Sequence, residues 1–273
     1  MTGPLISAEA LAASATRPTL LDVRWTLGGP PGLAEYETGH IPAAVFVNLD
    51  TELAGTPGSN GRHPLPARES FQAAMQAAGV QNKGPVVVYD GGSSMSAGRA
   101  WWLLRYYGHG DAAVLDGGLA AWVGAGYPVT TEPSRVERGD FVARPGAMPV
   151  LMAQDVPVLA ARGALLDARA PERFTGEHEP IDPVAGHIPG AVNVPATTTL
   201  DSCGRLLERS ALREIFERAG VGDGVEVGAY CGSGVTAAHE VLALELAGYE
   251  AALYPGSWSE WITDPRRQVV RGS

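Results

Sequence analysis

A cysteine flanked by glycines is the clearest candidate for chemistry in this chain. The run from Cys231 to Thr236 reads Cys-Gly-Ser-Gly-Val-Thr, and it lies between a predicted strand and a predicted helix. Gly232 and Gly234 permit a tight loop whose N–H groups point inward, and the helix N-terminus adds partial positive charge. Such surroundings favour a thiolate, so Cys231 is expected to be a nucleophile rather than a structural cysteine.

The elements on either side place this loop at the end of a sheet. Residues 225–230 read as a buried strand, and residues 236–247 read as a helix that stops at Gly248. The first half of the chain repeats the pattern, with a strand at 86–89 and a helix at 97–107. Alternating strands and helices predict an α/β fold, with mostly parallel sheets flanked by helices. Ligands then bind at the carboxyl ends of the strands.

Paired motifs indicate two copies of one domain. The matching segments are 20–24 and 165–169, 39–42 and 186–189, and 78–80 and 219–221, with Tyr89 matching Tyr230 and Trp122 matching Trp261. Their order is preserved at nearly constant spacing, as expected of a tandem repeat. We expect an N-terminal domain at 1–135, a linker at 136–148 and a C-terminal domain at 149–273.

Composition narrows the class of partner and the compartment. A net charge of -10, from 30 acidic and 20 basic residues, repels phosphate backbones and anionic membranes, so neither nucleic acid nor a membrane is expected as a partner. Two cysteines are too few for a disulfide scaffold, which favours a reducing compartment and a cytoplasmic protein. No metal-ligand spacing and no nucleotide-binding motif is present, so no metal and no cofactor is expected.

Together these motifs resemble the two-domain rhodaneses, a sulfurtransferase family, over nearly the whole chain. The resemblance rests on the Asp-x-Arg strand ends, the Gly-His-Ile-Pro motifs and the six-residue cysteine loop. It implies that Cys231 takes a sulfane sulfur from a small-molecule donor and holds it as a persulfide. The sulfur then passes to cyanide or to a thiol such as that of a dithiol protein. Only the C-terminal copy is expected to be catalytic, because Asp90 stands at the position of Cys231 and cannot carry a persulfide.

The form of the loop indicates the donor. It resembles the loop of 3-mercaptopyruvate sulfurtransferases, whereas thiosulfate enzymes usually place basic residues after the cysteine. Thiosulfate is a dianion that calls for nearby cations, while the small, neutral Gly232 and Ser233 leave room for a three-carbon donor. Ile181 stands where mercaptopyruvate enzymes often have a second arginine, so thiosulfate remains the alternative donor.

The resemblance adds candidate residues outside the loop. Arg173 matches the position of an arginine that binds the donor's carboxylate. His63 and Asp50 match a histidine and an aspartate proposed to reach toward Ser233, which predicts a Ser233–His63–Asp50 proton relay. The other reading of His63 and Asp50 is that they only pack between the domains. The rest of the loop is expected to surround the substrate: Gly232, Gly234, Val235 and Thr236.

Other classes of function are less well supported. A tyrosine-type phosphatase needs an arginine six positions after its cysteine, and that position is Ala237. A non-enzymatic sulfur carrier or binding module remains open, because the first copy shows that the fold does not require the nucleophile. Cys203 is expected to be an exposed spare thiol. Charged and histidine side chains that recur in both copies are expected to be structural, namely Asp22, Arg24, His40, Asp167, Arg169 and His187.

Overall fold

The computed structural model describes residues 3–272, which divide into two compact units. The first unit contains the chain up to Gly55 together with Pro66–Met148 and Ser202–Leu206, and the second contains Thr56–Leu65, Pro149–Asp201 and the chain from Leu207 onward. Each unit therefore includes a short segment from the other half of the sequence. The repeat pattern gave no indication of these two exchanges.

The first unit is built on a five-stranded parallel sheet with strand order β1-β5-β4-β2-β3. Its strands are β1 (Leu5–Ile6), β2 (Thr19–Asp22), β3 (Val45–Phe46), β4 (Val86–Tyr89) and β5 (Ala112–Leu115). Its helices are α1 (Ala8–Ala12), α2 (Gly32–Thr38), α3 (Leu49–Glu52), α4 (Arg68–Ala77), α5 (Met95–Tyr106) and α6 (Gly118–Gly124). All residues of β4 are buried, because helices cover both faces of a parallel sheet.

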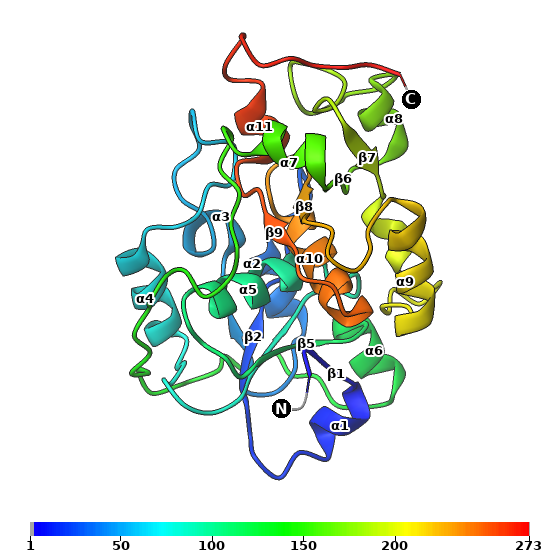
Figure 1. Cartoon of the computed structure of the whole chain (residues 1–273). Helices are drawn as coiled ribbons and strands as arrows, with labels where there is room; N and C mark the ends of the chain where they lie inside the picture. Colours follow the sequence, from blue (N-terminus) through cyan, green and yellow to red (C-terminus); the bar gives the residue numbers. More distant parts are fainter. Residues whose placement is uncertain (1–2, 273) are drawn as a thin grey trace. The chain divides into compact units, whose positions relative to one another are not determined.

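The second unit holds a four-stranded parallel sheet with strand order β7-β6-β8-β9. Its strands are β6 (Ala164–Asp167), β7 (Ala191–Asn193), β8 (Val227–Tyr230) and β9 (Ala252–Leu253). Its helices are α7 (Val156–Arg162), α8 (Pro171–Thr175), the 3₁₀ helix η1 (Ala196–Thr199), α9 (Arg209–Arg218), α10 (Thr236–Ala247) and α11 (Ser257–Trp261). Figure 1 shows these elements in green through red.

Packing around α10 explains its sequence. This helix contacts β8, β9, η1 and α9, and nine of its twelve residues are buried. α10 carries apolar residues on all sides, as an interior helix does, although it also buries His239 and Glu240. By contrast, α9 is amphipathic and buries only Leu212 and Phe216, four residues apart. Gly248 ends α10 in the left-handed conformation, with φ of 92°, as its position in the sequence predicted.

Local differences from the sequence expectations have local causes. The strand expected from residue 225 begins at Val227, because Val225 forms a turn by donating its N–H to the Gly222 carbonyl at 3.1 Å. The linker at 136–148 has no helix or strand, but Phe141 and Ala143 within it are buried in the first unit. It is therefore only partly a surface segment. In the described part of the chain, no helix is both long and apolar enough to cross a bilayer.

The repeated charged and histidine side chains stabilise the carboxyl end of each sheet. In the second unit, Arg169 donates from Nε and Nη2 to Asp167 at 3.0 and 2.6 Å, and His187 stacks on Phe174 with ring centroids 3.7 Å apart. The first unit repeats both contacts with Arg24 and Asp22 and with His40 and Tyr36. These contacts support the structural role expected for these side chains.

Candidate active site

Cys231 begins the loop between β8 and α10 and is only 3% exposed. Its Sγ accepts a hydrogen bond from the Gly234 N–H at 3.1 Å, so the loop curls back onto the sulfur. Gly234 has φ of 78°, and a Cβ there would lie 2.3 Å from the carbonyl oxygen of Pro255. Only glycine fits this position, which is the tight turn expected from the sequence.

A second segment, Pro255–Ser259, fixes the loop from its other side. Ser257 accepts the Cys231 N–H on its Oγ at 3.1 Å and donates to the Tyr254 carbonyl at 2.8 Å. The N–H groups of Trp258 and Ser259 bind the carbonyls of Cys231 and Gly232. Ser257 itself has φ of 53°, a conformation that costs free energy in any residue other than glycine. The loop geometry is thus held by long-range contacts that no local motif predicts.

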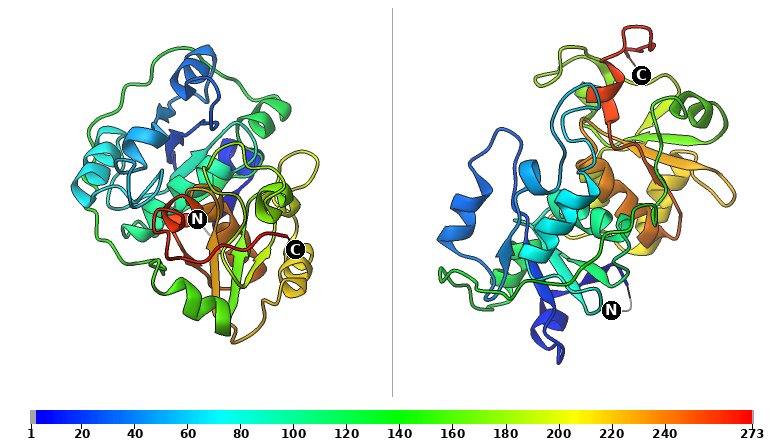
Figure 2. Two further views of the ribbon diagram at one scale, coloured as in Figure 1. Left: turned by 90° about the horizontal axis from the view of Figure 1, so that it is seen from above. Right: turned by 90° about the vertical axis from the view of Figure 1, so that its left-hand side faces the viewer.

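Ser233 and His63 are brought together. The serine Oγ lies 2.7 Å from Nδ1 of the histidine, and both residues are 5% exposed. His63 belongs to the segment Thr56–Leu65, which is part of the second unit. This segment, light blue in Figure 2, runs beside the red α11, where the Arg62 N–H donates to the Ser259 Oγ at 3.0 Å. The hydroxyl and the imidazole can therefore exchange a proton two residues along the loop from Cys231.

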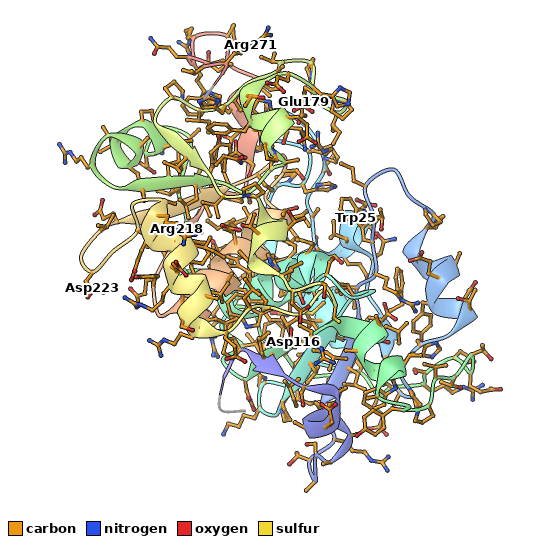
Figure 3. The ribbon with its side chains drawn as sticks, turned by 90° about the vertical axis from the view of Figure 1, so that its right-hand side faces the viewer. Trp25, Asp116, Glu179, Arg218, Asp223 and Arg271 are labelled. Carbon is orange, nitrogen blue, oxygen red and sulfur yellow. The ribbon has the colours of Figure 1, made fainter. Side chains whose placement is uncertain are left out.

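Asp50 belongs to the first unit. Both of its carboxylate oxygens lie 3.0 Å from Nε1 of Trp25, a residue labelled in Figure 3. This contact occupies part of the hydrogen-bonding capacity of the carboxylate. The His63–Asp50 step of the proposed relay stays a prediction.

Arg173 projects from α8 to the cysteine loop. Its Nε donates to both oxygens of Glu179 at 3.0 Å, and its Nη2 donates to Asp182 at 2.9 Å. A Cβ built on Gly232 would lie 3.4 Å from Nη1 and Nη2, so the guanidinium faces the residue next to Cys231. This is a suitable place for a group that binds a donor's carboxylate.

A second guanidinium, absent from the sequence-based candidates, lies at the same point. Nη2 of Arg62 would be 3.2 Å from a Cβ on Gly232, and Nη1 donates to Asp182 at 2.7 Å. Its neighbour His63 was the only sequence signal that could have drawn attention to it. Ile181, where a second arginine was sought, is 40% exposed and donates its backbone N–H to Glu179.

The surroundings of Glu179 favour its ionised form. Burial alone would raise the pKa of Glu179, but hydrogen bonds from Arg173 and from two backbone N–H groups hold that pKa below its usual value. Glu179 also lies 3.5 Å from Arg169, and Figure 3 labels it in the segment after α8. The site is therefore a network of buried ion pairs beside the loop, and residues 3–272 include no group of His, Cys, Asp and Glu side chains suited to a metal ion.

The corresponding loop of the first unit contains a carboxylate in place of the thiol. Asp90 is 3% exposed, and it accepts backbone N–H groups from Gly92 and Ser94 on Oδ1 and from Ser96 and Ala97 on Oδ2, at 2.9–3.3 Å. The repeat thus shows that a loop of this length directs its N–H groups at an anion carried on its first residue.

Comparison with known proteins identifies the family. Rhodanese-like domains match residues 7–125 and 152–264. The chain belongs to the rhodanese family. The two matches account for both copies found in the sequence, so the expected fold of tandem rhodanese-like domains is confirmed.

Individual relatives of this rhodanese are sulfurtransferases. A probable 3-mercaptopyruvate sulfurtransferase of Pseudomonas aeruginosa is 47% identical over 278 residues, covering 98% of each chain. A putative thiosulfate sulfurtransferase, SseB of Mycobacterium tuberculosis, is 46% identical over 261 residues, covering 93% of this chain and 91% of its own. The crystal structure of SseA, a 3-mercaptopyruvate sulfurtransferase of Escherichia coli, matches with a TM-score of 0.84 and 34% identity, covering 95% of this chain and all of that one. The expected class of activity, sulfur transfer, is confirmed.

Proposed function

We propose that this rhodanese transfers sulfur from 3-mercaptopyruvate to a thiol or cyanide through a persulfide on Cys231. The observation that carries the proposal is the buried Sγ of Cys231, around which the glycine loop curls. The Ser233–His63 pair belongs to the same loop, and the guanidiniums of Arg62 and Arg173 face its Gly232. The names of relatives from Pseudomonas aeruginosa and Escherichia coli support this donor.

The first half of the reaction moves one sulfur atom. The Cys231 thiolate attacks the sulfur of the donor, an S–S bond forms, and the bond between that sulfur and C3 breaks. The electron pair of the broken bond stays on carbon as the enolate of pyruvate, and the proton of the donor's thiol moves to C3. The products are pyruvate and the Cys231 persulfide anion, so the two sulfur atoms are oxidised while C3 is reduced.

Ser233 and His63 are suited to moving that proton. In the tautomer that carries its proton on Nε2, the imidazole accepts the serine hydroxyl proton on Nδ1. Ser233 can then receive the donor's thiol proton and return it to C3 of the enolate. Both groups are largely shielded from water, which strengthens their hydrogen bonds to a developing charge.

The second half of the reaction regenerates the enzyme. An acceptor thiolate or cyanide attacks the outer sulfur, the S–S bond breaks, and the Cys231 thiolate leaves. The products are an acceptor persulfide or thiocyanate. A dithiol protein is a suitable acceptor, because its second thiol resolves the persulfide, and a reducing compartment such as the cytoplasm keeps such thiols available.

Thiosulfate is the second candidate donor. The putative thiosulfate sulfurtransferase of Mycobacterium tuberculosis, at 46% identity, favours it. The two donors leave different products, pyruvate from one and sulfite from the other. Assays of the purified protein with each donor, with cyanide as acceptor and both products measured, therefore test the proposal. A higher kcat/KM with 3-mercaptopyruvate supports it, and a higher kcat/KM with thiosulfate contradicts it.

A further inference from the structure

A cavity of about 620 Å³ lies within the second unit and is lined by residues other than those of the candidate active site. Its walls come from α7, from the loop before β7, and from α11 with the chain that follows it. The apolar part of the lining consists of Pro157, Ala160, Ala161, Ile188, Pro189 and Trp261. Small-molecule sites typically have a volume of roughly 300–1,000 Å³ and a mostly apolar lining, so this cavity has the dimensions and the character of such a site.

The floor of the cavity is part of the hydrophobic core. Ile188 is fully buried and Trp261 is 3% exposed, and both belong to one core cluster, against which Ala160 also packs. The indole N–H of Trp261 donates to the Gln268 carbonyl at 2.9 Å, which fixes the ring and uses its only polar group. The cavity is therefore formed before any ligand binds.

Two neighbouring arginines line the cavity and differ in their partners. Arg266 binds both oxygens of Asp264 through Nε and Nη2, at 2.9 and 2.8 Å. Arg267 donates from Nη1 to the backbone carbonyls of Glu260 and Trp261 at 2.8 and 3.4 Å, and its guanidinium carbon lies 5.5 Å from the centroid of the Trp261 ring. In the described chain, Nε and Nη2 of Arg267 make no hydrogen bond and no carboxylate pairs with this side chain.

The edge of Arg267 that carries Nε and Nη2 is the one through which other arginines of this protein bind carboxylates. Arg24 and Arg169 each bind an aspartate through these two nitrogens, as Arg266 does. A guanidinium presents two parallel donors along this edge, which match the two oxygens of one carboxylate. The edge of Arg267 therefore fits a carboxylate that the protein itself does not supply.

The charge at the cavity fits one such group. Asp264 neutralises Arg266, and among the described residues no acidic side chain lines the cavity. Arg267 thus contributes one uncompensated positive charge, in a protein whose net charge is -10. A ligand with one carboxylate and an apolar body complements both the cation and the walls, whereas a dianion would exceed the charge available.

We propose that this cavity is a second binding site, which takes a monocarboxylate with an apolar chain or ring. The carboxylate binds the Nε and Nη2 edge of Arg267, and the apolar part lies against Ala160, Ile188 and Trp261. The inference does not depend on the donor proposed above. Trp261 ends α11, whereas the cysteine loop is held by Ser257 at the start of that helix, so the two sites use different residues.

Calorimetric titration with decanoate tests the site, and decanamide, which has the same chain without the charge, tests the role of the carboxylate. We expect one decanoate to bind per protein, and the affinity for decanamide to be roughly ten- to a hundredfold lower. Arg267→Met should lower the affinity for decanoate by a similar factor and change that for decanamide little. Ala161→Trp should weaken the binding of both ligands, because the indole then fills part of the cavity.

Two other arginine variants are the matched controls. Arg218→Met removes a 72% exposed arginine of α9, and Arg173→Met removes an arginine beside the cysteine loop. Both should bind decanoate as the wild type does. Thermal unfolding identifies a variant that does not fold. If Arg267→Met fails this check, Arg267→Lys takes its place and should still weaken decanoate binding, because lysine keeps the charge but lacks the two parallel donors.

The outcomes separate this site from the cysteine loop. Loss of decanoate affinity in Arg267→Met, with full affinity in Arg173→Met, supports the second site. The reverse pattern places the carboxylate at the cysteine loop and overturns the proposal. The proposal is also overturned if decanoate shows no saturable binding to the wild type, or if decanoate and decanamide bind with equal affinity.

Discussion

The Oγ of Ser233 and Nδ1 of His63 lie 2.7 Å apart, although 170 positions separate the two residues in the sequence. The hydrogen bond joins a loop of the second repeat to a segment of the first half of the chain. It links the Ser233 hydroxyl to a group that can accept its proton, and it is the contact on which the proposed proton transfer depends.

Removing either partner of this pair should slow the chemical step. We expect Ser233→Ala and His63→Asn each to lower kcat for 3-mercaptopyruvate by roughly a hundredfold or more, because proton transfer to C3 then relies on water. The double variant should lose little more than either single variant, since both act in one step. Steady-state pyruvate release measures this effect, and full activity in Ser233→Ala would contradict the relay.

Cys231 should carry the transferred sulfur. After treatment with 3-mercaptopyruvate, intact-protein mass spectrometry should show the gain of one sulfur atom in the wild type and no gain in Cys231→Ser. Cys203→Ser is the control, because Cys203 is exposed and lies in the first unit. A sulfur adduct that persists in Cys231→Ser would place the persulfide elsewhere.

Arg173 should contribute to donor binding more than to turnover. We expect Arg173→Met to raise the KM for 3-mercaptopyruvate roughly ten- to a hundredfold, through loss of a charge-assisted hydrogen bond. Arg218→Met, which changes a 72% exposed arginine of α9, should leave KM unaltered. Thermal unfolding followed by circular dichroism checks that Arg173→Met still folds. An unaltered KM in the folded variant would show that Arg173 does not bind the donor's carboxylate.

Asp90 should stabilise the first unit rather than act in catalysis. Its carboxylate accepts four backbone N–H groups, and Asn would aim an NH₂ group at some of these donors. We expect Asp90→Asn to lower the free energy of unfolding by about 2–4 kcal/mol in urea titrations. The exposed change Glu137→Gln should have almost no effect. Equal stability of Asp90→Asn and the wild type would show that the N–H groups find other acceptors.

Glu240 should make stability depend on pH. This residue of α10 is fully buried, and neither carboxylate oxygen has a hydrogen-bond partner. Burial, with a smaller effect from the charge of Asp167, raises the pKa of Glu240 from 4.5 to about 8. The folded state therefore prefers the protonated acid, so its contribution to stability is complete below pH 4.5 and is lost as the pH rises toward 8.

Glu240→Gln removes this dependence because glutamine never ionises. We expect the variant and the wild type to unfold at similar temperatures near pH 4. By pH 8 the variant should be more stable, by a difference on the order of 3 kcal/mol. Thermal unfolding at intervals from pH 4 to pH 9 measures the two curves, and parallel curves would contradict the shifted pKa.

Local patterns were enough to place Cys231 in a loop between a strand and a helix. The strand before Cys231, the glycines after it and the start of α10 at Thr236 are all readable because they depend on neighbours in the sequence. The family and the tandem fold also follow from motifs that repeat at regular spacing, and both are confirmed.

Contacts between distant segments could not be read in the same way. Ser257 accepts a hydrogen bond from the Cys231 N–H although it lies 26 residues away in the sequence. Its local sequence, a single serine after a glycine, does not indicate this contact. Arg62 lies in the half of the sequence that lacks Cys231, so a search near Ile181 could not find it. Its proximity to Gly232 depends on the grouping of residues 56–65 with the second unit.

That grouping limits how the chain can be divided or recombined. A fragment that begins at Pro149 keeps Cys231 and Ser233 but lacks the histidine and the arginine supplied by Thr56–Leu65. We therefore expect the C-terminal repeat alone to lack the proposed proton transfer, even though its sequence matches a complete domain. A gene fusion or domain swap made at the linker would have to carry residues 56–65 as well to keep the His63–Ser233 hydrogen bond.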